Sequence, residues 1–171
     1  MGDGTPGDRA VKGGPRRSAG ILLWHRAGDG SLEVLLGHPG GPYFAKKDAD
    51  VWSILKGEYD SDEDPFEVAK REFFEESGHD APDGTALPLG EIRQKGGKLV
   101  IAWALEGSLD PASASSNTFP MEWPPRSGRT IQVPEIDRVA WFDLEAAREK
   151  LKAAQHPLLD RLADAVDDGS S

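Results

Sequence analysis

The segment from residue 57 to residue 78 concentrates side chains that could bind a divalent cation. It holds nine acidic residues against two basic ones, so its net charge of −7 is most of the −10 that the whole chain carries. Clustered carboxylates without soft ligands favour a hard cation, Mg²⁺ or Mn²⁺, which also binds phosphate oxygens. The nine acidic residues are Glu58, Asp60, Asp62, Glu63, Asp64, Glu67, Glu72, Glu75 and Glu76.

Three of these carboxylates share one side of a helix predicted over residues 64–77. Because successive residues on a helix are rotated by about 100°, Glu72, Glu75 and Glu76 fall within an arc of about 100°. The arc borders an apolar stripe made by Phe66, Ala69 and Phe73. A solvated acidic face is the alternative interpretation. Against it, like charges at this spacing repel by roughly 0.2–0.5 kcal/mol per pair, and the helix dipole disfavours anions in the last turn.

Residue types at both ends support the limits of this helix. Asp64 suits the N-cap and Pro65 the first turn, and Glu67 completes a capping-box-like pair with Asp64. Gly78 stands where a helix commonly ends in a left-handed residue. The acidic arc is therefore expected on a helix with a defined start and a defined end.

The rest of the chain is predicted to supply a sheet and further helices that position this one. Strands are expected at residues 18–25, 32–37, 87–94, 98–105 and 138–142. Helices are expected at residues 144–152 and 157–166. A hairpin turn is predicted at residues 95–97, and residues 106–129 are interpreted as a long Ser- and Pro-rich loop. This order predicts an α/β fold with a mixed sheet covered by helices.

Composition favours one domain and excludes several function classes. The chain has 171 residues, and we expect a disordered tail over 1–17, a domain over 18–166 and a frayed end over 167–171. The chain has no cysteine, which excludes disulfides, thiolate metal sites and cysteine nucleophiles. The acidic balance argues against nucleic-acid and anionic-membrane binding. Neither a signal-peptide pattern nor an apolar run of membrane-spanning length is found, so a cytoplasmic protein is expected.

The acidic segment resembles the Nudix box, the signature of hydrolases that act on nucleoside diphosphates linked to another moiety. All seven fixed positions of the box are present at the right spacing, and they are Gly57, Glu63, Arg71, Glu72, Glu75, Glu76 and Gly78. Two positions depart from the family pattern: His79 replaces an aliphatic residue, and Leu55 replaces the proline of a W-x-x-P-K-G approach. The resemblance extends from about Arg17 to Leu162 and implies a Nudix-type α/β/α sandwich.

The resemblance implies a divalent metal ion, Mg²⁺ or else Mn²⁺, at the box. In similar proteins the glutamates that match Glu72 and Glu76 bind the metal. The glutamate that matches Glu75 and the backbone carbonyl that matches Lys56 assist them. The four positions are therefore expected to hold the ion together.

The resemblance also implies supporting residues and a general base. Arg71 and Glu63 would stand behind the ligands and hold them in place. The base that activates water would be either Glu72 or a glutamate on a distant loop. Glu135 is our loop candidate, and Glu122 competes with it.

Substrate contacts are expected from basic and aromatic side chains near the mouth of the site. Lys56 is the first candidate for a phosphate, and Arg126 is a further one. Trp52 could stack on a nucleobase, although packing in the core is the alternative for such a residue. Further candidates are Lys46, Lys47, Arg129, Tyr43, Phe44 and Trp123.

Together these features predict a metal-dependent pyrophosphohydrolase that cleaves a phosphoanhydride bond in a nucleotide or dinucleoside polyphosphate. One alternative is a hydrolase specific for dinucleoside or inositol polyphosphates, which the W-x-x-x-K-G approach favours. Another is a catalytically silent Nudix-like module that binds nucleotides, although every metal position is intact. The expected partner is a nucleotide or another small diphosphate, and the oligomeric state stays open.

Overall fold

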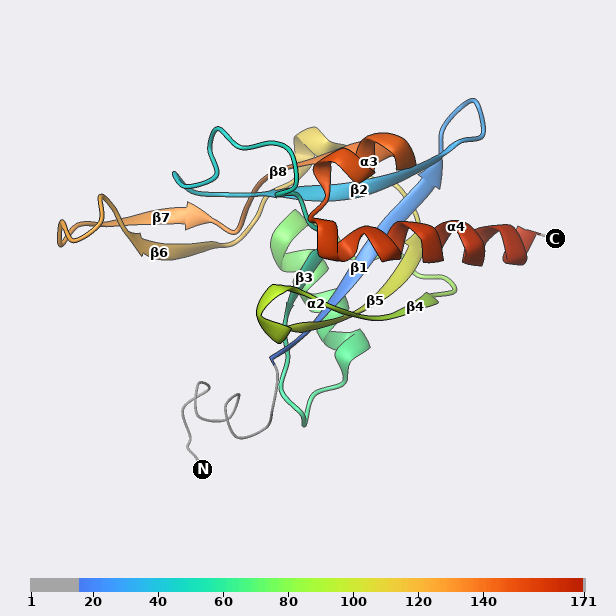
Figure 1. Cartoon of the computed structure of the whole chain (residues 1–171), viewed down its shortest axis with the longest axis horizontal. Helices are drawn as coiled ribbons and strands as arrows, with labels where there is room; N and C mark the ends of the chain where they lie inside the picture. Colours follow the sequence, from blue (N-terminus) through green and yellow to red (C-terminus); the bar gives the residue numbers. More distant parts are fainter. Residues whose placement is uncertain (1–15, 171) are drawn as a thin grey trace.

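A mixed β-sheet with helices on both faces forms the body of the molecule (Figure 1). The computed structural model describes the backbone of residues 16–170 and the side chains of residues 16–167. Residues 1–15 of the predicted tail therefore lie outside the described part of the chain. The helices are α2 (Pro65–Ser77), α3 (Leu144–Lys150) and α4 (His156–Ser170), with short 3-10 turns η1 (Lys95–Gly97), η2 (Pro111–Ser113) and η3 (Ala153–Gln155).

The central sheet contains six strands within residues 16–170, in the order β4-β5-β1-β2-β8, and β3 also pairs with β1. The strands are β1 (Arg17–Arg26), β2 (Leu32–Pro39), β3 (Leu55–Glu58), β4 (Leu87–Arg93), β5 (Leu99–Glu106) and β8 (Ile136–Asp143). β1 and β5 are parallel, and the other pairs named here are antiparallel. The predicted α/β fold with a mixed sheet is confirmed.

Strand β1 is buried on both faces and supplies side chains to both halves of the core. Ile21 and Leu23 pack in one cluster with Phe73 of α2. Leu22 and Trp24 pack in the other cluster, which also contains residues of α3 and α4. Because successive side chains of a strand point to opposite faces, the apolar run of β1 places α2 on one face of the sheet and α3 with α4 on the other.

Helix α2 begins and ends where its sequence predicts. The Asp64 side chain accepts a hydrogen bond from the backbone N–H of Phe66 at 3.3 Å. Gly78 adopts φ = 77°, and its N–H donates to the carbonyl of Phe74 at 2.7 Å. Glu67 forms an ion pair with Lys70 at 3.0 Å, so the predicted capping-box role of Glu67 is replaced by a contact along the helix.

Two segments differ from the sequence prediction. The expected loop 106–129 contains β6 (Thr118–Glu122), which pairs with β7 (Thr130–Pro134) in a separate two-stranded ribbon that projects from the body (Figure 1). Pro120 hid this strand in the sequence, although an edge strand tolerates a residue without an N–H. Strand β3 was also not predicted, because Lys56, Gly57 and Glu58 have low strand propensity.

The C-terminal helix α4 extends through Ser170, beyond the end predicted at Val166. Its buried side chains come from the part that packs on the sheet, and they include Leu158, Leu159 and Leu162. Residues 16–170 include no helix with the length and apolar character needed to cross a membrane.

Candidate active site

Strand β3 lies against the acidic side of α2 and fixes the position of two carboxylates. The backbone N–H of Lys56 donates a hydrogen bond to Oε1 of Glu76 at 3.1 Å. A Cβ atom built on Gly57 would lie 2.2 Å from the carboxylate of Glu72, so only glycine leaves room for that side chain. The glycine of the motif is therefore required by a close contact between β3 and α2.

Burial and mutual repulsion raise the pKa values of this carboxylate pair, Glu72 and Glu76. Glu76 is only 8% exposed. Burial first and the charge of Glu72 second raise the pKa of Glu76 to about 8. Burial first and the charge of Glu75 second raise the pKa of Glu72 to about 7. The fold thus holds two acids where a bound cation would favour their ionised forms.

Arg71 connects the carboxylates of α2 to the loop that precedes the helix. Its guanidinium lies 3.3 Å from a carboxylate oxygen of Glu63, 3.8 Å from one of Glu72 and 3.9 Å from one of Glu75. Glu63 also accepts a hydrogen bond from the backbone N–H of Asp60 at 2.9 Å, which lowers the pKa of Glu63. Arg71 is about half exposed, so these contacts orient the acids more than they stabilise the fold.

Two adjoining cavities, of about 280 and 170 Å³, open beside the carboxylate pair and share Lys56, Glu76 and Glu135. The larger is also lined by Ser18, Gly57, Glu58, Glu72, Lys98 and Asn117. The smaller is also lined by Gly37, Pro39, Val51, Ser53, Ile54, Ile136 and Lys152. A third cavity, of about 620 Å³, shares no residue with these two, and none of its lining residues comes from α2.

The structure brings Glu135 to the carboxylate pair. Glu135 lies between β7 and β8, where its N–H donates to the Asn117 carbonyl at 2.9 Å and its carbonyl accepts from Gly40 at 3.1 Å. Its charge contributes to the raised pKa values of both Glu72 and Glu76. Its own side chain is exposed. Glu135 therefore lies beside the carboxylate pair and remains open to solvent.

The structure does not bring Glu122 or Arg126 to these cavities. Glu122 lies on β6, and its carboxylate accepts a hydrogen bond from the N–H of Gly128 at 2.8 Å. Arg126 is an exposed residue of the β6–β7 turn, in the left-handed region with φ = 59°. Both residues belong to the projecting ribbon and line neither cavity.

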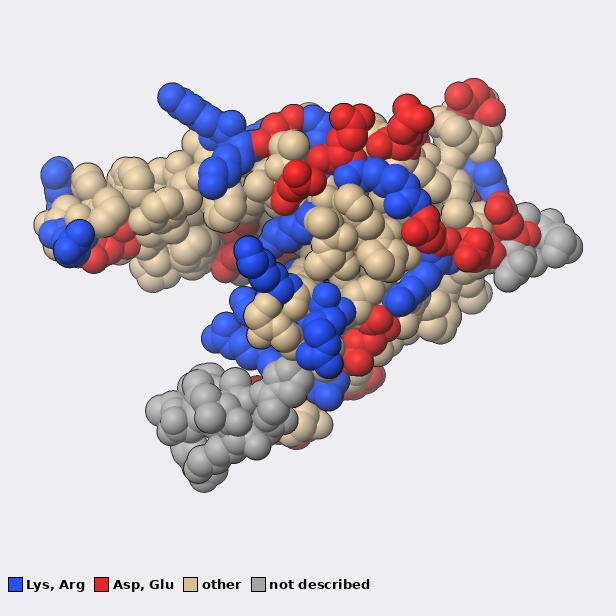
Figure 2. Space-filling model, in the orientation of Figure 1, with Lys and Arg blue, Asp and Glu red and all other residues tan. Residues whose placement is uncertain are grey.

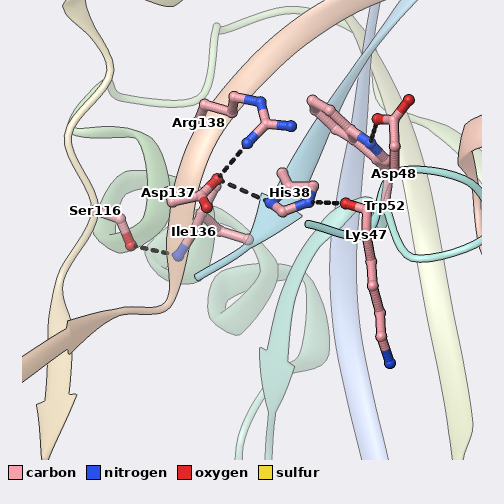
Figure 3. Close-up of polar contacts among 8 residues, drawn as sticks. All are labelled: His38, Lys47, Asp48, Trp52, Ser116, Ile136, Asp137 and Arg138. Carbon is pink, nitrogen blue, oxygen red and sulfur yellow. Dashed lines mark hydrogen bonds and ion pairs between the residues drawn. The ribbon is translucent and has the colours of Figure 1, made fainter. Parts of the chain in front are cut away.

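The structure places Trp52 in the core, which corrects the expectation that its ring stacks on a base. Trp52 is 3% exposed, and its Nε1–H donates to Asp48 at 3.0 Å. Its ring packs edge-on against Phe142 and His38. Figure 3 shows His38 between the Asp137 carboxylate and the Lys47 carbonyl, 2.9 and 2.6 Å from its ring nitrogens. Trp52 and His38 thus fix the loop between β2 and β3 against β8.

The donors around the carboxylate pair fit a hard divalent cation. Among the described side chains, no three acidic or histidine groups are already arranged as a ligand set. The oxygen donors of Glu72, Glu76 and Glu75, with the Lys56 carbonyl, are nevertheless of the type that magnesium and manganese prefer. The raised pKa values supply the physical reason for such an ion, because its charge would offset the repulsion between buried acids.

Sequence reasoning missed Lys98 and Lys152, which line the larger and the smaller cavity respectively. Lys98 directly precedes β5, and Lys152 lies between α3 and η3. Neither residue belongs to a motif, and both lie at least 20 residues from the acidic segment. No local pattern could therefore have assigned them to the site.

Comparisons with known proteins agree with this geometry. The model of the NUDIX domain matches residues 14–162. An 8-oxo-(d)GTP phosphatase of Mycolicibacterium smegmatis is 29% identical over 142 residues, which are 80% of this chain and 37% of that protein. The chain thus spans little more than a third of the length of this relative.

Solved structures share the fold at lower identity. A Caenorhabditis elegans Ap4A hydrolase, in a binary complex, superposes with a TM-score of 0.61 at 21% identity, covering 88% of this chain and 98% of that one. The NUDIX domain of Shewanella oneidensis NrtR, complexed with ADP ribose, gives 0.59 at 16% identity, covering 95% and 99%. The matched domain includes α2, β3 and Glu135, and from this match over most of its length the chain belongs to the NUDIX domain family.

Proposed function

We propose that this chain is a metal-dependent pyrophosphohydrolase that cleaves a phosphoanhydride bond in a nucleoside diphosphate linked to another moiety. The observation that carries this proposal is the carboxylate pair on α2, with Glu76 buried and Glu72 partly buried, fixed by β3 and open to two cavities. Membership of the NUDIX family supports it, as do the names of the relatives, one a phosphatase of 8-oxo-(d)GTP and one a hydrolase of Ap4A.

Glu72 and Glu76 would hold the ion with help from Glu75 and the Lys56 carbonyl, and Mg²⁺ is the first candidate, with Mn²⁺ as the alternative. When bound, such an ion neutralises phosphate oxygens and lowers the pKa of a bound water. Arg71 keeps the acids oriented through the three contacts described above.

Hydrolysis also needs a base, and we assign this role to Glu135. A water oxygen attacks phosphorus, the bridging P–O bond breaks, and the second phosphate leaves with the electron pair of that bond. Glu135 takes the proton of the attacking water on its carboxylate. Glu72 is the alternative base. Its pKa is raised to about 7, however, and as a metal ligand it is needed in its ionised form.

The substrate is a nucleotide or another small diphosphate, and dinucleoside or inositol polyphosphates are the narrower candidates. A silent nucleotide-binding module is the second candidate function, and the NrtR domain of the same fold was solved in complex with ADP ribose. The intact carboxylate pair favours hydrolysis over silent binding. We also propose a cytoplasmic location, with which a sequence that needs no disulfide is compatible.

An assay of product formation tests the proposal, because cleavage between the two phosphates leaves one phosphate on each product. The purified chain is incubated with a panel of nucleoside diphosphate derivatives, with Mg²⁺ or with excess chelator, beside the Glu76→Gln variant, and the products are separated by ion-exchange chromatography. We expect magnesium-dependent cleavage of at least one compound by the wild type and none by the variant. Binding of these compounds without cleavage under any condition would favour the silent module.

A further inference from the structure

Glu135 joins the β6–β7 ribbon to the central sheet, since β7 ends at Pro134 and β8 begins at Ile136. Figure 2 shows this ribbon extending away from the body of the molecule. No other described residue forms a hydrogen bond or an ion pair with the Glu135 carboxylate. The place of this side chain beside Glu72 and Glu76 therefore depends on how the backbone is held where the ribbon meets the sheet.

A β-bulge in β8 lies directly after Glu135. In the register of β2 with β8, His38 pairs with Arg138 and Pro39 pairs with Ile136, so Asp137 is an extra residue between the two pairs. A bulge turns a side chain in a new direction, and bulges are common beside active sites. The Asp137 carboxylate points to β2, where its Oδ1 lies 2.9 Å from Nδ1 of His38 (Figure 3).

The imidazole ring of His38 is itself held from several sides. The residue is fully buried, its Nε2 donates to the Lys47 carbonyl at 2.6 Å, and the ring of Trp52 packs against it edge-on. The carbonyl and the carboxylate are both acceptors, so the full set of hydrogen bonds forms when both ring nitrogens carry a proton. The bond to Asp137 is then charge-assisted, and such bonds are among the stronger ones in proteins.

Backbone contacts connect this pair to Glu135. The Glu135 carbonyl accepts a hydrogen bond at 3.1 Å from the N–H of Gly40, which lies two residues after His38. A Cβ atom built on Gly40 would lie 2.0 Å from the Pro134 carbonyl oxygen, so the two segments are in close contact here. Asp137 lies two residues after Glu135, and the two bonds thus close a ring of six residues, three from each segment.

We propose that His38 is a positioning residue for the base: by binding Asp137 across the bulge, it holds Glu135 beside Glu72 and Glu76. This rests on the proposed function, in which Glu135 takes the proton of the attacking water. The hold matters for the rate, because a displacement of about 1 Å can cost on the order of 10²-fold.

Two variants separate the bond to Asp137 from the bond to Lys47. The amide nitrogen of asparagine is as many bonds from Cα as Nδ1 of histidine, so His38→Asn keeps a donor for Asp137. The amide nitrogen of glutamine matches Nε2, so His38→Gln keeps a donor for Lys47 only. We expect His38→Gln to lower kcat by roughly 10–100-fold, with KM and the affinity for Mg²⁺ nearly unchanged, and His38→Asn to keep most of the rate.

Each variant loses one hydrogen bond of the buried ring, so their melting temperatures should fall alike. A purely structural role of His38 would therefore give the two variants equal rates. Asp137→Ala removes the same contact from its partly exposed side, and its rate should match that of His38→Gln. His25→Gln is the matched control, because His25 also lies 2.8 Å from a carboxylate of the neighbouring strand, that of Glu33, but lines neither cavity.

A double variant shows whether His38 acts through Glu135. In the Glu135→Gln background, His38→Gln should cause no further loss of rate, because the group that it positions is already absent. A contribution of His38 to the metal site or to the fold would lower the rate again. Such a further loss would overturn the proposal, as would wild-type rates in both His38→Gln and Asp137→Ala.

Amide hydrogen exchange tests the hold without turnover. The N–H of Gly40 reports the bond to Glu135, and the N–H of Lys56 reports the bond to Glu76. In His38→Gln, exchange at Gly40 should become faster while exchange at Lys56 stays unchanged. Unchanged exchange at Gly40 would overturn the proposal. If exchange responds as expected but the wild type cleaves no compound, the hold on Glu135 stands and the proposed hydrolase activity fails.

Discussion

The acidic side and the basic side of the site are built in different ways. The carboxylates lie within five residues of one helix, so the spacing of one motif places them together. Lys56, Lys98 and Lys152, which line the cavities, come from three segments that are joined by Gln155, by the sheet and by the hydrogen bond from the Lys152 N–H to the Trp52 carbonyl. The acidic side chains are thus placed together by a local motif, whereas the basic side chains beside them are brought together by the whole fold.

The largest effect in this comparison is expected on the acidic side, from Glu76→Gln. Glutamine retains the oxygen that accepts from the Lys56 N–H, so the fold should persist. Loss of the charge should reduce turnover by more than the roughly 10²–10⁴-fold that a general base contributes. Steady-state product formation measures the loss, and a variant with wild-type turnover would remove Glu76 from the metal site.

Glu135→Gln should lower turnover by roughly 10²–10⁴-fold while leaving the affinity for Mg²⁺ nearly unchanged. The residue is adjacent to the carboxylate pair but belongs to another segment. Rate-versus-magnesium titrations of Glu135→Gln and Glu72→Gln separate the two candidate bases, because Glu72→Gln should damage both the rate and the affinity.

Glu122→Gln is the matched control for this experiment. The Glu122 carboxylate accepts a hydrogen bond from Gly128 in the β6–β7 turn, away from the cavities. The turnover of the Glu122→Gln variant should therefore equal that of the wild type. A collapse of activity in Glu122→Gln, with normal activity in Glu135→Gln, would reverse the assignment.

Arg71→Ala should lower turnover by roughly 10–100-fold, the usual effect of a residue that supports metal ligands. Its pairs with Glu63, Glu72 and Glu75 are half exposed, so the melting temperature should change little. Lys70→Ala, one residue away and paired with Glu67, is the matched control. Equal rates for the two variants would show that Arg71 is an ordinary surface residue.

The smallest effect concerns the stability of the metal-free protein as a function of pH. The pKa values of Glu72 and Glu76, about 7 and about 8, lie above their ordinary value of 4.5. Their contribution to stability is therefore full below about pH 4.5 and is lost as the pH rises through 7 and 8, since the folded state then holds ionised buried acids. Thermal melts with chelator should show a melting temperature that falls across this range, less so in Glu76→Gln. A flat profile in the wild type would contradict the raised pKa values.

The sequence allowed the acidic side to be predicted because each of its signals is local. Caps, helical spacing and the position of Gly57 depend on neighbours within about 20 residues, and the structure has α2 within the predicted limits. The mixed sheet was predictable because β1, β2 and β5 are continuous apolar runs. Strand β6 was not, because Pro120 stands in the middle of its short alternating pattern and it pairs with β7 outside the central sheet.

The rest of the site could not be predicted, because its residues come together only through contacts between distant parts of the sequence. Lys98 and Lys152 are brought to the cavities by contacts across more than 60 residues, such as the hydrogen bond between Gln155 and Gln94. Trp52 is the opposite case: it lies near the motif and was considered for stacking on a nucleobase, but its ring packs against Phe142. Proximity in sequence to a catalytic motif therefore did not by itself indicate a binding role.

The most direct test of the account is the stabilisation of the protein by magnesium near pH 7.5. A ligand at 100 times its Kd adds about 2.7 kcal/mol to the free energy of unfolding, which raises the melting temperature of a chain of this size by roughly 5–10 °C. The account predicts this rise in the wild type and in Glu67→Gln, an exposed acid of the same helix, and its loss in Glu76→Gln. An equal rise in Glu76→Gln would contradict the claim that the carboxylate pair binds the ion.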